Sequence, residues 1–199
     1  MKIKYNAPVT LSFAFLCGGI LALDSVFKTN IIPFLFTAYG RGQFNPTDWL
    51  GYVRLFTHVA GHANWLHFIG NFTFILLLGP ILEEKYGASR LLGMMLITAF
   101  VTGIIYAFFF EGLLGASGIA FMMILLISFT NFEKGEIPLT LILIIPLYLM
   151  KEIFSINSSS DSNIAHLAHI AGGLCGGLFG FTAPTKLSDE DDEPRNMDY

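Results

Sequence analysis

Long apolar stretches recur along nearly the whole chain, and they constrain its fold more than any other feature. A helix needs about 20 mostly apolar residues, within a range of about 17–25, to cross the hydrocarbon core of a bilayer. Six stretches come close to that length: Ala7–Phe27, Trp65–Leu82, Leu91–Phe110, Ser117–Phe132, Ile137–Phe154 and Ala165–Phe181. Because backbone polar groups in lipid must bond within their own segment, these stretches are predicted to be helices. The sequence therefore predicts an all-α polytopic membrane protein, a bundle of six transmembrane helices.

The composition agrees with this class. Only 13% of the 199 residues are charged, against about 25% in soluble domains. We expect one membrane domain over residues 1–183 and a disordered acidic tail over 184–199, which carries the whole net charge of −4. The neutral body offers no basic patch for nucleic acid. Cys17 and Cys175 lie in apolar stretches and indicate neither a disulfide framework nor a metal site.

The distribution of basic residues predicts the topology. Lys2 and Lys4 precede the first stretch, which could therefore be a signal peptide, but it is long for one and shows no cleavage site before Asp24. We expect an uncleaved first helix. Seven Lys and Arg residues then fall on the side of the termini and four on the other. This bias predicts that both termini lie in the cytoplasm. We expect a multi-pass protein of the plasma (inner) membrane.

A long external segment, about residues 28–64, connects the first two predicted spans. Connections of this length within compact domains are usually functional. It contains Trp49, Tyr52 and Phe56 and ends at Trp65, and such aromatics favour the membrane–water interface. We expect a partly helical structure in the outer leaflet.

Few polar side chains interrupt the predicted spans, and such groups tend to mark function. They are His67 and Asn71 in the second span, Ser117 at the start of the fourth, and His166 and His169 at the start of the sixth. All lie toward the external ends of their helices. The sequence therefore predicts one water-accessible cavity that they share.

Ser117 and His169 have structural and catalytic interpretations. Ser117 could simply cap its helix, and His169 could be a packed core residue. However, a serine at a helix N-terminus lies beside free N–H groups that stabilise an oxyanion. Gly115 and Gly118 would let a substrate backbone approach, and glycine recurs at every fourth position from Gly172, which permits close helix packing. Such packing could bring the imidazole within hydrogen-bonding reach of the serine.

Two pairs of residues lie four positions apart and therefore share a helix face. His67 and Asn71 could donate hydrogen bonds to an oxyanion at Ser117, although Asn71 could also bond between helices. His58 and His62 could form a metal pair, but no carboxylate or cysteine partner lies nearby in the sequence. We expect them to orient the external segment, and we treat His166 as a packing neighbour of the site.

These residues resemble the rhomboid family of intramembrane serine proteases. The matching pieces are RLFTHVAGHANWLHFIGN, the GASG turn and AHIAGG, in this order on the second, fourth and sixth spans, within residues 51–181. The family often has a Trp-Arg pair where this chain has Val53-Arg54. The resemblance implies that Arg54 anchors the external segment and that Glu83 anchors the end of the second helix.

The resemblance also implies a function. It implies a dyad of Ser117 and His169, an oxyanion site from His67, Asn71 and the serine N–H, and no cofactor or metal. Substrates would be transmembrane segments of membrane proteins that enter laterally, often beside the fifth helix, which Pro146 could kink. The alternatives are a catalytically inactive relative that escorts membrane proteins and a histidine-ligated metal or haem protein. The sequence does not indicate an oligomeric state.

Overall fold

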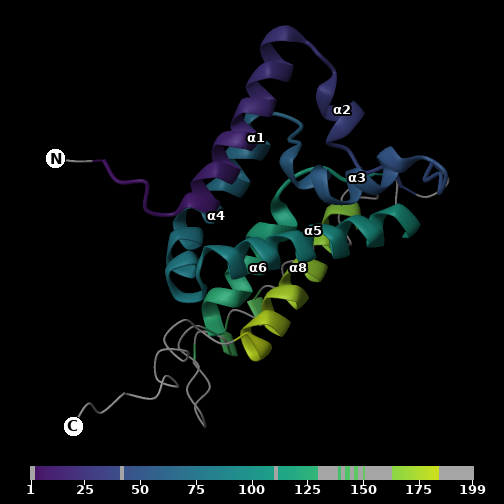
Figure 1. Cartoon of the computed structure of the whole chain (residues 1–199). Coiled ribbons are helices and arrows are strands. Elements are labelled where there is room, and N and C mark those ends of the chain that lie inside the picture. Colours follow the sequence, from purple (N-terminus) through teal and green to yellow (C-terminus); the bar gives the residue numbers. More distant parts are fainter. Residues whose placement is uncertain are drawn as a thin grey trace, which may run out of the picture.

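The computed structural model describes residues 3–40, 43–109, 112–129 and 163–183, and single positions between 139 and 150. In these parts the chain forms helices and a single isolated β-bridge (Figure 1). The helices are α1 Pro8–Phe27, α2 Ile31–Leu35, α3 Trp49–Thr57, the 3-10 helix η1 His58–Ala60, α4 Trp65–Tyr86, α5 Ala88–Phe109, α6 Ser117–Phe129 and α8 Asn163–Thr182.

The predicted all-α polytopic fold is confirmed. Among the described residues, three helices are long and apolar enough to cross a membrane, over Pro8–Phe27, Trp65–Tyr86 and Ala88–Ala107, and α6 is a shorter apolar helix. α4 continues four residues beyond the predicted end at Leu82. Hydropathy falls at the charged residues that follow Leu82, but the helical hydrogen bonds continue through them. Most of the predicted fifth span, Ile137–Phe154, and all of the predicted tail, 184–199, lie outside the described residues.

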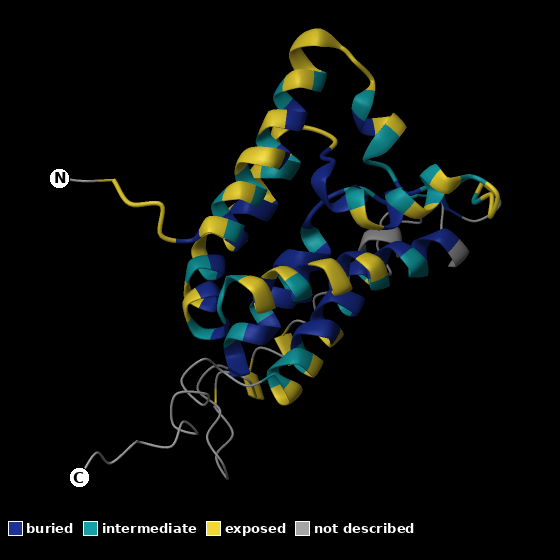
Figure 2. Ribbon diagram, viewed as in Figure 1, coloured by how far each residue is buried: buried dark blue, intermediate teal, exposed yellow. Residues whose placement is uncertain are grey.

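The core of the bundle surrounds α6. Nine of its thirteen residues are buried, and it packs against α4, α5 and α8. The outer helices bury their inward faces and expose apolar side chains on their outward faces (Figure 2), as Phe15, Leu77 and Leu174 do. Exposed apolar faces of this kind suit contact with lipid.

The start of α1 is fixed to the end of α4 by one carboxylate. Pro8 occupies the first turn of α1, where its missing N–H costs nothing. Glu83 accepts hydrogen bonds from Val9 N at 2.9 Å, Thr10 N at 3.1 Å and Thr10 Oγ1 at 2.9 Å. A Cβ atom at Gly79 would lie 2.5 Å from Thr10 Cγ2, so the two helices touch. The expected anchoring role of Glu83 is confirmed.

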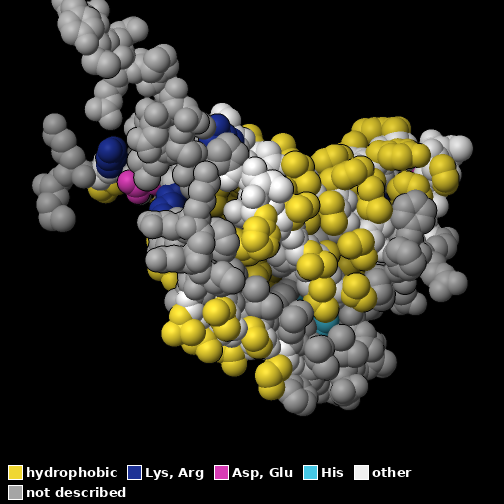
Figure 3. Space-filling view, turned by 90° about the horizontal axis from the view of Figure 1, so that it is seen from below, with side chains coloured by type: hydrophobic (Ala, Val, Ile, Leu, Met, Phe, Trp, Pro, Cys, Tyr) yellow, Lys and Arg dark blue, Asp and Glu magenta, His cyan; other side chains and the backbone are white. Residues whose placement is uncertain are grey.

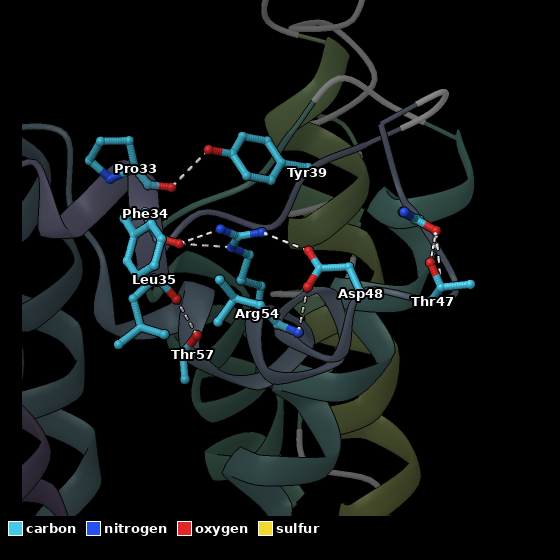
Figure 4. Close-up of polar contacts among 10 residues, drawn as sticks. Pro33, Phe34, Leu35, Tyr39, Thr47, Asp48, Arg54 and Thr57 are labelled. Atoms are coloured by element: carbon cyan, nitrogen blue, oxygen red, sulfur yellow. Dashed lines mark hydrogen bonds and ion pairs between the residues drawn. The ribbon is translucent and has the colours of Figure 1, made fainter.

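The external segment is partly helical, as predicted, and Arg54 holds it together (Figure 4). The guanidinium donates from Nε and Nη2 to the Phe34 carbonyl oxygen at 2.9 and 2.5 Å, and Nη1 lies 3.7 Å from Asp48 Oδ2. It also stacks over the Tyr39 ring at 4.6 Å. Arg54 therefore joins α3 to the end of α2.

The external segment also packs directly on the bundle. A Cβ atom at Gly103 of α5 would lie 2.4 Å from the Leu55 carbonyl oxygen of α3. His58 Nε2 lies 3.0 Å from the Ala99 carbonyl oxygen of α5. The predicted interfacial aromatics, Trp49, Tyr52, Phe56 and Trp65, remain exposed. The segment therefore has a buried face on the bundle and an apolar face directed outward.

Candidate active site

The turn that precedes α6 has a backbone that favours glycine. Gly115 has a φ of +115°, in the left-handed region. A Cβ atom there would lie 2.8 Å from His67 Nε2 and 3.6 Å from Asn71 Nδ2. Both side chains of α4 therefore reach the GASG turn, and Ser117 is the first residue of α6 directly after it.

The external segment holds the same turn from another direction. Gly115 N donates to the His58 carbonyl oxygen at 2.9 Å, and Ala116 N donates to His62 Nε2 at 3.5 Å. Just before the turn, Ala38 and Leu113 exchange two backbone hydrogen bonds of 2.9 Å. The N–H groups of Gly115 and Ala116 are thereby paired with a segment far away in the sequence.

His62 is part of this arrangement, which the sequence analysis did not predict. Its ring packs edge-on to His67 at 5.2 Å. Burial is the main reason that the pKa of His62, like that of His58, falls to about 4. Both rings are therefore neutral near pH 7, and neutral His62 can accept the Ala116 hydrogen bond. The sequence feature that could have indicated this role is the four-residue spacing between His58 and His62.

A cavity of about 280 Å³ lies beside the turn. It is lined by residues of α4, α6 and α8: Gly70, Asn71, Phe74, Ser117, Ala120, Phe121, Ile124 and His169. The structure thus brings together Ser117, His169 and Asn71, whereas His67 lies against Gly115 and does not line the cavity. No carboxylate is among the lining residues that the structure describes.

Close packing of α8 on α6 carries His169 to this cavity. A Cβ atom at Gly172 would lie only 2.1 Å from the Gly118 carbonyl oxygen. The His169 ring packs against the Phe121 ring in a tilted arrangement, with 4.2 Å between the ring centroids, and its centroid lies 6.0 Å from that of His166 in an edge-on arrangement. Phe121 was not predicted; only its position one helical turn after Ser117 could have indicated it.

The Ser117 hydroxyl and the His169 imidazole belong to residues that line the same cavity. The Asn71 Nδ2 atom is buried and has no partner in the described part of the chain, so it remains available as a donor to a group placed in the cavity.

The described residues do not form a cluster of side chains that could bind a metal ion. Within the ranges given above, no group of three or more His, Cys, Asp or Glu side chains is placed to hold one. His58 and His62 instead bond Ala99 and Ala116.

Comparisons with known proteins agree with this architecture. A family model described as "Rhomboid domain" matches residues 50–185. Proteins named rhomboid protease GlpG from Yersinia pestis (strain Pestoides F) and Yersinia pseudotuberculosis serotype O:3 (strain YPIII) are 26% identical over 172 residues. The match covers 84% of this chain but only 60% of each of those relatives. Since the matched domain spans more than half of the chain and contains the GASG turn and all the cavity residues, the chain belongs to the rhomboid family.

Proposed function

We propose that this chain is an intramembrane serine endopeptidase that cleaves transmembrane segments of membrane proteins. One observation supports this most: Ser117 of α6, His169 of α8 and Asn71 of α4 line one cavity in a chain of the rhomboid family. Its relatives are named proteases, and we extend that activity to this chain as a proposal.

In the proposed mechanism, the Ser117 hydroxyl attacks a peptide carbonyl while His169 takes its proton. Collapse of the tetrahedral intermediate breaks the C–N bond, and His169 returns the proton to the leaving amine. Water then attacks the acyl-enzyme with His169 again acting as base, which releases the new carboxylate and regenerates the serine. Packing against the Phe121 ring would restrict rotation of the imidazole through both steps.

The oxyanion is proposed to be stabilised by donors from α4 and from the start of α6. The negative oxygen would accept hydrogen bonds from the buried Asn71 Nδ2, from His67 and from the backbone N–H of Ser117. Loss of one such donor typically costs about 100- to 1000-fold in rate. Gly115 and Gly118 would keep the approach to the serine free of side chains.

Substrates are proposed to be membrane proteins whose helix unwinds locally, since the carbonyl of an intact helix is shielded. Entry would be lateral, and the membrane would be the plasma (inner) membrane, with both termini in the cytoplasm. The seven-to-four distribution of Lys and Arg supports that orientation.

The test is cleavage of a model single-span protein by the purified enzyme in liposomes. Ser117→Ala and His169→Ala should reduce cleavage to background, and Asn71→Ala should reduce it by about 100-fold or more. Ser128→Ala is the matched control, because Ser128 is a buried serine of the same helix whose hydroxyl bonds the Ile124 carbonyl. Cleavage that persists in Ser117→Ala would refute the assignment.

Labelling by a fluorophosphonate distinguishes the alternative. The protease should be labelled at Ser117 only when His169 is present. A chain that binds the segment but is neither labelled nor active would be an escort protein.

A further inference from the structure

A second cavity, of about 520 Å³, lies where α1 begins and α4 ends. Its lining residues come from the chain before α1, the end of α4 and the start of α5: Lys4, Asn6, Pro8, Pro80, Ile81, Glu83, Glu84, Gly87 and Ala88. Along α4, Glu83 lies twelve residues from Asn71, which is about 18 Å in an α-helix. The cavity is therefore separate from the proposed catalytic site and has a volume typical of ligand sites.

Two opposite charges face this cavity without a protein partner. Lys4 and Glu84 are both exposed, and within the described residues neither takes part in a hydrogen bond or an ion pair. Glu83 differs, because α1 uses both of its oxygens. Within the described part of the chain, the cavity lining therefore includes one lysine and one glutamate without a protein partner.

Apolar residues also line the cavity, and they lie at the ends of two helices of membrane-spanning length. Pro8 is at the start of α1, and Pro80 and Ile81 belong to the last turns of α4, with Ile81 exposed. On the face seen in Figure 3, hydrophobic side chains dominate, and the visible Lys, Arg, Asp and Glu side chains gather at one edge. Since α1 and α4 are of membrane-spanning length, we expect the helix ends that line this cavity to lie at the boundary between hydrocarbon and water.

We propose that this cavity binds the headgroup of an aminophospholipid such as phosphatidylethanolamine. Its phosphodiester would pair with Lys4 and its primary ammonium with Glu84, while Pro80 and Ile81 contact the glycerol and the first methylenes. Pockets with basic residues at the ends of transmembrane helices are suited to lipid headgroups. Charge-assisted hydrogen bonds to both ends of a zwitterion match the two free charges.

The lipid class follows from the charges. Phosphatidylcholine carries a quaternary ammonium with no N–H to donate to Glu84, and phosphatidylglycerol carries no cation at all. All three lipids keep the phosphodiester that Lys4 would bind. The preference for phosphatidylethanolamine should therefore depend on Glu84, whereas the affinity for every phospholipid should depend on Lys4.

The experiment is a titration of the purified full-length chain in detergent with each short-chain lipid, with bound lipid counted by native mass spectrometry. The wild-type chain should bind phosphatidylethanolamine about three- to fivefold more tightly than phosphatidylglycerol, as an exposed charge pair would give. Glu84→Gln should abolish that preference, and Lys4→Gln should weaken binding of all three lipids. Lys28→Gln, a neutralised lysine at the other end of α1, should change neither.

Three results would overturn the proposal. The first is equal binding of the three lipids by the wild-type chain. The second is a preference for phosphatidylethanolamine that Glu84→Gln does not change. The third is displacement of the lipid by soluble glycerophosphoethanolamine at equal concentration, which would show that the site takes a free phosphodiester. Thermal unfolding of each variant checks that the fold is retained, and cleavage activity is not needed for any readout.

Discussion

Substitution of Gly172 by alanine tests the contact on which the proposed dyad depends. The added Cβ atom would lie 2.1 Å from the Gly118 carbonyl oxygen. Ordinary contact begins at 3.4 Å, so the methyl group is 1.3 Å too close. The neighbouring atoms are backbone and cannot rotate away, so α8 must shift relative to α6.

The shift should reduce both stability and activity. Overpacking of a filled core costs about 1–3 kcal/mol, which lowers the unfolding temperature. His169 lies one turn before Gly172, and so it moves with the displaced helix while Ser117 stays with α6. A misplacement of about 1 Å can cost about 100-fold in rate, so we expect a loss of that order in turnover of a transmembrane substrate.

The matched control is Gly177→Ala on the same helix, since a Cβ atom there meets nothing within 4 Å. It should retain activity and gain up to about 1 kcal/mol from helix propensity. The assay is cleavage in liposomes at a temperature well below unfolding, with thermal unfolding in micelles measured in parallel. A Gly172→Ala protein with wild-type turnover and unfolding temperature would show that α6 and α8 are not packed as described.

Three further predictions concern the anchors. Glu83→Gln removes the charge that binds the start of α1 and should destabilise the chain by about 1–3 kcal/mol in thermal unfolding; an unchanged unfolding temperature would contradict the cap. Arg54→Lys cannot form the two-pronged bond to the Phe34 carbonyl and should cost about 1–2 kcal/mol by the same measurement. Burial lowers the pKa of His58 and His62 from 6.5 to about 4, so the unfolded chain takes up protons first. Stability should then be complete above pH 6.5 and decline towards pH 4 by about 3 kcal/mol for each histidine; an unfolding temperature independent of pH in this range would refute it.

Local sequence patterns predicted most of the helices, because hydropathy alone distinguishes a spanning segment. The starts of α4 and α6 were predicted at Trp65 and Ser117, where the structure has them. The ends were less accurate: α4 continues through Glu83, whose charge ends the apolar pattern but serves to cap another helix. That contact joins residues more than seventy positions apart, and no local pattern contains it.

The candidate site was predicted in part. The polar residues of three spans were expected to meet, and Ser117, Asn71 and His169 do line one cavity. Their catalytic roles stay predictions. His62 and Phe121 were missed because their roles depend on which way a ring points after the chain has folded, and a histidine or phenylalanine near an apolar run carries no such information.

The geometry around Ser117 depends on two sets of contacts that restrain different degrees of freedom. Glycine packing between α6 and α8 fixes the distance from the serine to His169, and it acts within the membrane. Hydrogen bonds from Gly115 N and Ala116 N to the external segment fix the orientation of the turn, and with it the start of α6, where we propose the Ser117 N–H as an oxyanion donor. Substitutions in the glycine packing should therefore impair the proposed proton transfer from Ser117 to His169, and with it labelling of the serine. Changes in His62 should impair chiefly oxyanion stabilisation, which would leave labelling by a reactive phosphonate less affected than peptide cleavage.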